Sequence, residues 1–296
     1  MTFSSTMCWL HVSSSLHIGA GQGTGFIDLP IMREKTTNWP LVPGSALKGV
    51  LRDHFASREG SENALFNTAF GATSDAESQA GALVFGDLNL VALPVRSLFG
   101  TFAYATSALT LQRLKRTLTI MDPRLERLPD VLELDDKQEI FCSTQSVLIS
   151  KDTIYLEEFD YRFRESAESQ AWAEYMAEAV FPTDKAWQQI FKERFAIIPD
   201  ESFNFFAEHG TEVVARIRIK AETKIVESGA LWYEESLPAE SILAGVVWCD
   251  RVPGKGIDGV QLLDRFCTDP LALQLGGKAS VGKGRVEAVF SSREGR

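Results

Sequence analysis

Segments typical of strands and segments typical of helices alternate along the whole chain, and this order most restricts its fold. The strand-like segments are aliphatic or aromatic runs at residues 7–14, 82–93, 101–106, 242–249 and 285–290. The helix-like segments repeat apolar residues at helical spacing, at residues 45–55, 107–118, 172–179, 187–195 and 258–267. This interleaving predicts a mixed α+β fold with irregular insertions.

Apolar residues make up 45% of the 296 positions, which is enough for a substantial core without disulfides or a structural metal. No apolar run approaches the roughly 18–20 residues that span a bilayer, so we expect no membrane association. The first residues lack the basic start of a signal peptide. Because the four cysteines lie far apart in sequence, we expect buried thiols in a reducing cytoplasm.

The net charge of -10 argues at first against a nucleic-acid partner. However, residues 121–160 hold eleven acidic and four basic side chains, a local net of -7, which leaves only -3 for the rest of the chain. A basic groove elsewhere therefore remains compatible with the composition. We expect the acidic insertion 121–160 to face protein neighbours, since it would repel RNA.

Two glycine-rich runs fail as nucleotide-binding motifs. Residues 19–25 (GAGQGTG) lack the G-x-G-x-x-G spacing, and Pro30 follows too closely for a helix to open there. Residues 277–283 (GKASVGK) have Walker spacing, but Gly284 stands where the motif needs Ser or Thr. These departures argue against both a dinucleotide fold and an NTPase.

Three basic clusters are suited to phosphate groups, although each taken alone is compatible with an ordinary solvated surface. The first is the start of the helix after Pro43, which we expect Ser45 to cap, and the second is one face of a β-hairpin over residues 212–236. The third is the glycine loop near the C-terminus. Their residues are Ser45, Lys48 and Arg52; Arg216, Arg218 and Lys220; and Gly276, Gly277, Lys278, Gly282, Lys283, Gly284 and Arg285. Three separate clusters favour a polymer over a small ligand.

Asp28 is the main candidate for chemistry. It lies between apolar neighbours, after a glycine-rich loop and before Pro30. Beside a phosphodiester, its carboxylate would serve as a general base or a metal ligand, whereas an Asx-turn acceptor is the structural alternative. His17 begins the same loop. Glu234 and Glu235 end the hairpin, and because adjacent strand residues point to opposite faces, at most one should face the site.

The chain resembles the RAMP superfamily of CRISPR proteins in several motifs. The N-terminal ones are HIGAG at 17–21, IDLPIMREK at 27–35 and VPGSALKGVLR at 42–52, and the C-terminal one is LGGKASVGKG at 275–284. More narrowly, PVRSL at 94–98, AIIPD at 196–200 and GALWYEE at 229–235 resemble the backbone subunit of the Cmr (type III-B) effector complex. The resemblance covers nearly the whole chain.

This resemblance implies a single elaborated RAMP domain over residues 1–296, with a ferredoxin-like (RRM-like) palm, insertions, and a β-hairpin thumb over about 212–236. It implies copies stacked along a CRISPR RNA guide with other Cmr subunits, each cutting target RNA at regular intervals. By resemblance the catalytic residues are Asp28, His17 and Glu234 or Glu235. We expect a divalent metal, Mg²⁺ or Mn²⁺, at Asp28.

Two alternative functions stay open at this point. One is a non-catalytic scaffold that only coats the guide RNA, which would not require a carboxylate beside a scissile phosphate. The other is an endonuclease that processes the guide itself, for which His17 is the candidate acid or base.

Overall fold

The computed structural model describes residues 4–23, 25–59, 63–74, 77–121, 128–134, 136–252 and 256–291. The strands are β1 (Ser5–Val12), β2 (Leu41–Val42), β3 (Gly71–Ser74), β4 (Glu77–Ala80), β5 (Leu83–Phe85), β6 (Leu88–Arg96), β7 (Phe102–Ser107), β8 (Glu139–Cys142), β9 (Ile149–Ser150), β10 (Thr153–Leu156), β11 (Phe159–Glu165), β12 (Phe195–Ile198), β13 (Glu212–Ile219), β14 (Val226–Ser236), β15 (Ile242–Cys249), β16 (Leu271–Gln274) and β17 (Arg285–Phe290). The helices are α1 (Gly44–Glu59), α2 (Ala64–Phe70), α3 (Ala108–Met121), α4 (Ala167–Val180), α5 (Lys185–Arg194), α6 (Asp200–His209), α7 (Gly259–Phe266) and the short 3₁₀ turn η1 (Ala279–Val281).

Four antiparallel strands form the centre of the molecule, in the spatial order β17-β1-β15-β6. Along the chain these strands and two helices follow one another as β1, α1, β6, β15, α7 and β17. This is the β-α-β-β-α-β order of a ferredoxin-like fold. The predicted α+β class and ferredoxin-like palm are therefore confirmed.

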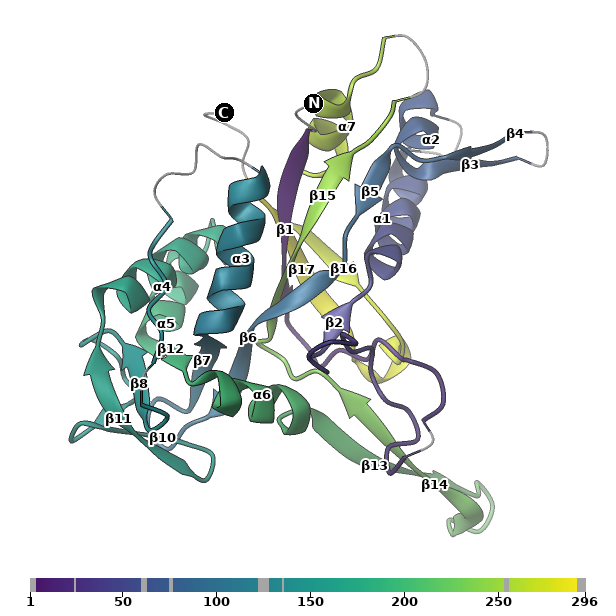
Figure 1. Cartoon of the computed structure of the whole chain (residues 1–296). Helices are drawn as coiled ribbons and strands as arrows, with labels where there is room; N and C mark the ends of the chain where they lie inside the picture. The colour runs from purple at the N-terminus through teal and green to yellow at the C-terminus, as the bar shows by residue number, and fades with distance from the viewer. Residues whose placement is uncertain are drawn as a thin grey trace.

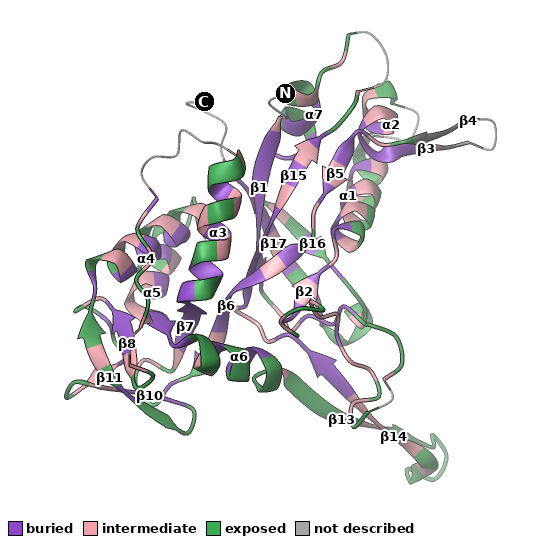
Figure 2. Cartoon of the chain, viewed as in Figure 1, coloured by how far each residue is buried: buried purple, intermediate pink, exposed green. Residues whose placement is uncertain are grey.

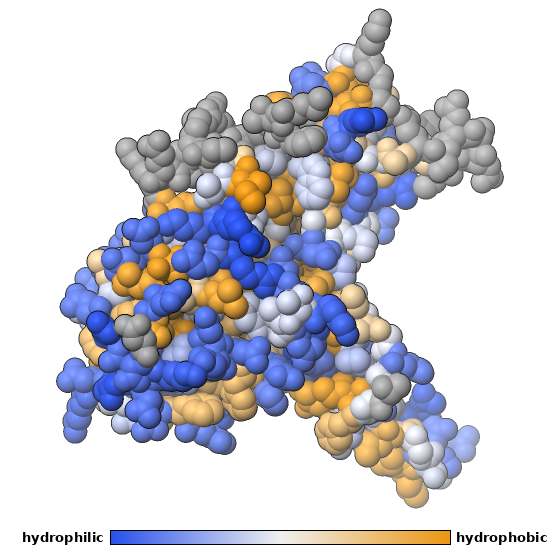
Figure 3. Space-filling model, viewed as in Figure 1, coloured by the Kyte–Doolittle hydropathy of each residue, from blue (hydrophilic) through white to orange (hydrophobic). Residues whose placement is uncertain are grey.

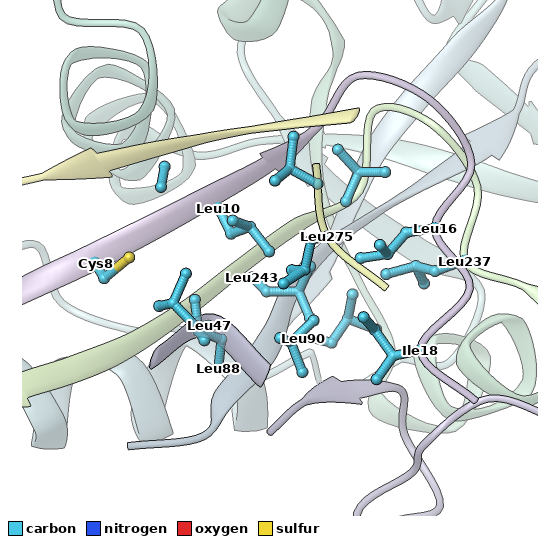
Figure 4. Packing of buried hydrophobic residues seen from close by; sticks show 14 of the residues in the cluster. Cys8, Leu10, Leu16, Ile18, Leu47, Leu88, Leu90, Leu237, Leu243 and Leu275 are labelled. Carbon is cyan, nitrogen blue, oxygen red and sulfur yellow. The ribbon is translucent and has the colours of Figure 1, made fainter. Parts of the chain in front are cut away.

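Strand β1 is buried along its whole length because both of its faces are covered. Cys8, Leu10 and Val12 point to the core on one face, where Leu10 lies near Leu47 of α1 and Leu243 of β15 (Figure 4). Met7 and Trp9 point to a second core beneath α3 and α4. A continuous apolar run is typical of a strand that is buried on both faces.

A second lobe is inserted between β6 and β15, to the left in Figure 1, where α3, α4 and α5 pack together with the strands. Its strands continue the central sheet from β6 through β7, β12, β8 and β11. The helix predicted over residues 187–195 ends at Arg194, because Phe195 begins a strand that pairs with Tyr104 of β7. Helix α6 was not predicted.

The predicted strand over residues 82–93 is interrupted at Gly86 and Asp87, where the start of α1 approaches. The Asp87 carboxylate accepts a hydrogen bond of 2.9 Å from the backbone N–H of Gly44. Only a glycine fits here, since a Cβ on Gly44 would lie 2.0 Å from the carbonyl oxygen of Phe85. Helix α1 thus begins one residue before Ser45, and the prediction that Ser45 caps it is wrong.

The hairpin of β13 and β14 projects away from the body of the molecule (Figure 1). Its strands pair with each other in a separate two-stranded sheet. Most of the hairpin is exposed, and burial begins only near its root at Glu234 (Figure 2). Its direction is fixed at that root, where the backbones of Leu16 and Leu237 exchange two hydrogen bonds of 2.8 Å.

In the described part of the chain, no helix is long and apolar enough to cross a membrane.

Candidate nucleic-acid interface

Three segments distant in sequence meet at the root of the β13–β14 hairpin. The loop after β1 pairs with the end of β14, where Leu29 N–H donates to the Tyr233 carbonyl (3.1 Å) and Glu235 N–H donates to the Leu29 carbonyl (3.0 Å). The C-terminal glycine loop joins them through Gly277 N–H, which donates to the carbonyl of His17 at 2.9 Å. The sequence-predicted residues Asp28, His17, Glu234 and Glu235 are therefore on adjoining segments.

Asp28 stands exposed at this junction. Its Oδ2 accepts a hydrogen bond of 2.8 Å from the backbone N–H of Tyr233, so the side chain extends the backbone pairing between the two segments. Its own carbonyl closes the glycine-rich loop by accepting from Gly23 N–H at 2.9 Å. The carboxylate is thus fixed in position and still accessible to a ligand.

His17 is buried beneath the same loop. Its partner is a carbonyl oxygen, so Nδ1 carries the proton and donates to Glu235 O at 2.7 Å. A Cβ on Gly19 would lie only 3.1 Å from Nε2, so the loop backbone passes closely over the ring. These contacts give the imidazole a clear role in holding the loop against β14.

Glu234 is buried among cations, with 3% of its surface exposed. It accepts hydrogen bonds from Lys278 Nζ (2.7 Å), the Trp232 indole (2.8 Å) and Arg216 Nε (3.3 Å). Burial acts to raise the pKa of Glu234, but the hydrogen bonds from Lys278 and Trp232 and the charges of Lys278 and Arg216 outweigh it and lower the pKa to about 2. It is therefore an anion that holds two basic side chains together.

Glu235 faces the other way, as the strand alternation predicts, and it is equally buried. Its Oε1 accepts from Arg33 (2.5 Å) and from the Thr211 hydroxyl (2.8 Å), and its Oε2 accepts from the backbone N–H of Ile31 (3.0 Å). Arg33 also donates to the carbonyl of Ala207 near the end of α6 (3.0 Å). Glu235 thus ties the segment around Ile31 and Arg33 to the hairpin root and to α6.

The C-terminal loop turns sharply where glycines adopt left-handed backbones, among them Gly276 and Gly284. Gly276 has φ +73° and Gly284 has φ +84°, and a Cβ on Gly284 would lie 2.1 Å from the Leu275 carbonyl oxygen. Arg285 is exposed, and Lys278 is partly exposed. Lys283 is buried instead, and its amine donates to the Ser236 hydroxyl at 2.6 Å, so it is not presented on the surface as the sequence led us to expect.

The other predicted basic residues are divided between two places. On α1, Ser45 is exposed and Arg52 is half-buried, while Lys48 donates to the carbonyl of Leu83 at 2.9 Å. Burial and then the charge of Arg52 lower the pKa of Lys48. On the hairpin, Arg218 pairs with Glu227 at 3.7 Å, and Lys220 is exposed near the tip.

Sequence reasoning missed the partners that hold the site together, above all Arg33, Tyr233 and Ser236. Arg33 lies within the quoted 27–35 motif, and Tyr233 lies within the 229–235 motif, so both were visible but had no role assigned. Their roles depend on contacts between residues far apart in sequence, 202 residues for Arg33 with Glu235 and 47 residues for Ser236 with Lys283. Local pattern gives no signal for such pairs.

Comparison with known proteins identifies the family of the chain. The sequence profile of the RAMP superfamily matches residues 9–287. The chain belongs to the RAMP superfamily. This confirms the resemblance drawn from the motifs at both ends of the chain.

Within the RAMP superfamily, the chain is 35% identical to the CRISPR system Cmr endoribonuclease Cmr4 of Pyrococcus furiosus, over 95% of this chain and 94% of that protein. The fold also matches the crystal structure of oligomeric Cmr4 from Pyrococcus furiosus, with a TM-score of 0.76, 25% identity, and 98% of each chain covered. A chain in the cryo-EM structure of the type III-B Cmr-beta complex bound to cognate target RNA has the same fold, with a TM-score of 0.74, 19% identity and 98% coverage of both chains.

The predicted metal stays a prediction. Among the residues that the structure describes, no three His, Cys, Asp or Glu side chains gather as ligands. Glu234 and Glu235 are occupied by cations, which leaves Asp28 as the available carboxylate at this junction. Because Mg²⁺ is commonly bound by one or two carboxylates plus substrate phosphates and water, this RAMP site fits a metal only together with bound RNA.

Proposed function

We propose that this chain is a CRISPR RNA-binding backbone subunit of a type III-B (Cmr) effector complex, and that it cleaves complementary target RNA at regular intervals in antiviral defence in the cytoplasm. Its partners in this proposal are the guide RNA, the target RNA, further copies of itself and other Cmr subunits. Support comes from its 35% identity to a protein named Cmr endoribonuclease, along nearly the full length of both.

One observation carries the catalytic part of the proposal. Asp28 combines exposure to solvent with a carboxylate fixed by the Tyr233 N–H at the base of a projecting hairpin. A structural Asx-turn acceptor would bond within its own loop, whereas Asp28 bonds to a strand 205 residues away. A fixed and accessible carboxylate at the base of a projecting hairpin is suited to act on a strand that the hairpin displaces.

The proposed reaction uses the RNA's own ribose as nucleophile. The hairpin displaces one target nucleotide, so its 2′-oxygen lines up with the adjacent phosphorus. Asp28 accepts the 2′-hydroxyl proton, the new O2′–P bond forms, and the P–O5′ bond breaks, with water protonating the leaving 5′-oxygen. The products are a 2′,3′-cyclic phosphate and a 5′-hydroxyl end.

A divalent metal, Mg²⁺ or Mn²⁺, is the cofactor that we propose at Asp28. When bound with the RNA, it would neutralise charge on the phosphate. Glu234 acts in this proposal by positioning Lys278 and Arg216, which it contacts on the same side. Lys278 is then directed towards the phosphate charge.

The guide backbone is held by the remaining basic residues. Lys48, Arg52 and Arg285 offer positive charge, whereas the N–H groups of Gly277, Gly282 and Gly284 in the glycine loop are bonded within the protein. Such contacts recognise shape and charge, while base pairing between guide and target supplies sequence recognition.

The guide-processing alternative is less well supported than it was from sequence. An acid or base for that reaction should be accessible, but His17 is buried and donates to the Glu235 carbonyl. The scaffold alternative differs from our proposal in one respect only, the chemistry at Asp28.

The deciding experiment uses the assembled complex with guide and labelled target RNA. Complexes carrying wild-type chain or Asp28→Asn are compared with Mg²⁺ and with EDTA. We expect regular cuts by the wild type, loss of all cuts with Asp28→Asn, and loss with EDTA. Regular cutting by a correctly assembled Asp28→Asn complex would support the scaffold alternative, with the nuclease elsewhere.

A further inference from the structure

An aromatic pair lies directly beside Asp28 and has no role in the function proposed above. Phe26 is 75% exposed, yet its ring lies 4.6 Å from that of Tyr233, with an angle of 32° between the ring planes. Large apolar side chains on a surface are common singly, but here an exposed ring lies against a second, half-buried ring at a tilt, which leaves one aromatic face open to solvent.

The position of the pair is fixed by the same contacts that fix Asp28. Tyr233 donates its N–H to the Asp28 carboxylate and accepts from Leu29 through its carbonyl. Phe26 stands two residues before Asp28, in a loop closed by the bond from Gly23 N–H to Asp28 O. Two residues of extended chain span about 7 Å, so the pair and the carboxylate are within reach of one nucleotide.

The apolar surface continues outward from this pair along one face of the hairpin. In the β13–β14 register, Tyr233 lies opposite Ala215, and Leu231 lies opposite Ile217. Leu231 is 56% exposed and Ile217 is 48% exposed, and Figure 3 shows hydrophobic residues on the projecting hairpin. The opposite face of the same root carries Arg216 and the buried Glu234.

We propose that Phe26 and Tyr233 form a stacking platform for an unpaired nucleobase of the target RNA, the base next to the bond that is cut. The inference rests on the proposed function of Asp28. Unpaired RNA bases are recognised by stacking on aromatic side chains, and every base presents a π-face, so this platform tolerates any target sequence. The base is held, and its ribose is thereby presented to the carboxylate.

A nucleobase fits this platform better than a protein neighbour does. The open aromatic face of the pair is that of Phe26, which is 75% exposed, and one ring face matches one base. Cationic side chains for the attached phosphates lie on the adjoining segments, with Arg216 on β13 and Lys278 on the glycine loop.

The test is a double-mutant cycle in the assembled complex, in which one change is made in the protein and the other in the target RNA. Single-turnover cleavage is measured on a normal target and on one with an abasic ribonucleotide at the displaced position. We expect Phe26→Ala and the abasic target each to slow cleavage about tenfold, and the two together to slow it no further. Phe26→Trp should cleave as the wild type does, and Phe26→Leu should resemble Phe26→Ala, because only Trp keeps the π-face.

A second measurement separates this inference from the proposed function. Asp28→Asn complexes are loaded with target that carries 2-aminopurine at the displaced position, whose fluorescence falls on stacking. We expect fluorescence to rise when Phe26→Ala is added, and not when Phe159→Ala, a matched exposed phenylalanine on β11, is added instead.

Unchanged fluorescence and an unchanged cleavage rate with Phe26→Ala would overturn the platform. It would also be overturned if the variant and the abasic target together slowed cleavage by the product of their separate factors, since they would then act independently. Failure of the variant to assemble, measured by native mass spectrometry, would overturn it as well, since it would mean that the ring packs against a protein neighbour. Cleavage by Asp28→Asn, in contrast, would overturn only the proposed function, because the fluorescence readout needs no cutting.

Discussion

The backbone N–H of Tyr233 donates to Oδ2 of Asp28 across 2.8 Å, joining a surface loop to the root of the projecting hairpin. The bond couples the two parts of the site, because any movement of the hairpin root carries the carboxylate with it. A carboxylate held in this way loses little conformational freedom when RNA binds. The predictions below follow from this junction and from the contacts that support it.

Asp28→Asn should leave folding and assembly intact, because the amide oxygen still accepts from Tyr233. We expect cleavage to fall by at least about 100-fold, the usual size of a lost general base. Gel analysis of target RNA gives the rate, and native mass spectrometry of the same complex checks assembly. A loss of assembly together with cleavage would instead assign Asp28 a structural role.

The two lysines of the C-terminal loop should behave differently, because only Lys278 reaches the surface. Lys278→Met should weaken RNA binding and reduce the slope of log affinity against log salt by about one. Lys283→Met should leave that slope unchanged and lower the free energy of unfolding by about 1–3 kcal/mol, since the buried Ser236 hydroxyl loses its partner. Equal effects of both variants on the slope would contradict this assignment.

The ion pairs of Glu234 should make stability depend on acid pH. The pKa of Glu234 is lowered from 4.5 to about 2 in the folded chain, so the carboxylate stabilises the fold above about pH 4.5 and this contribution is lost as pH falls towards 2. Glu234→Gln should therefore cost about 1–3 kcal/mol near pH 6 and much less near pH 3. Urea unfolding of both proteins at the two pH values measures the gap, and a constant gap would exclude the ion pairs as its source.

Two glycines of the C-terminal loop provide a matched pair of substitutions. Both Gly282 (φ +82°) and Gly284 (φ +84°) have left-handed backbones, but a Cβ meets nothing within 4 Å at Gly282 and lies 2.1 Å from the Leu275 carbonyl at Gly284. Gly282→Ala should cost about 1–2 kcal/mol through backbone strain alone. Gly284→Ala should cost about 1–3 kcal/mol more through the clash. Denaturant unfolding of the two variants should show this order, and a smaller loss at Gly284 would refute it.

The sequence allowed most of the palm to be predicted, because its elements are marked by local periodicity. The strand predicted at residues 242–249 is β15, and the helix predicted at 258–267 is α7, which Asp258 caps with its side chain. The misses fall where tertiary contacts override that periodicity. Phe195 continues an apolar helical pattern, yet it joins β12 because the edge of β7 offers it hydrogen-bond partners.

The candidate site was predictable as a set of residues but not as an arrangement. The motifs pointed to Asp28, His17 and the Glu234–Glu235 pair, and strand alternation alone predicted that the two glutamates point apart. What each glutamate contacts was decided by segments far away in the sequence, Lys278 for one and Arg33 for the other. The same holds for Lys283, whose amine is turned inward by Ser236.

By itself, the sequence determined where chain turns are possible and which faces are apolar, since steric freedom at glycine and the spacing of side chains are properties of neighbouring residues. Only the tertiary structure decided which charges are paired, which are presented to solvent, and that Phe26 lies on Tyr233 beside Asp28. Burial and hydrogen-bond partnership depend on segments brought together by the fold, and no local pattern encodes them.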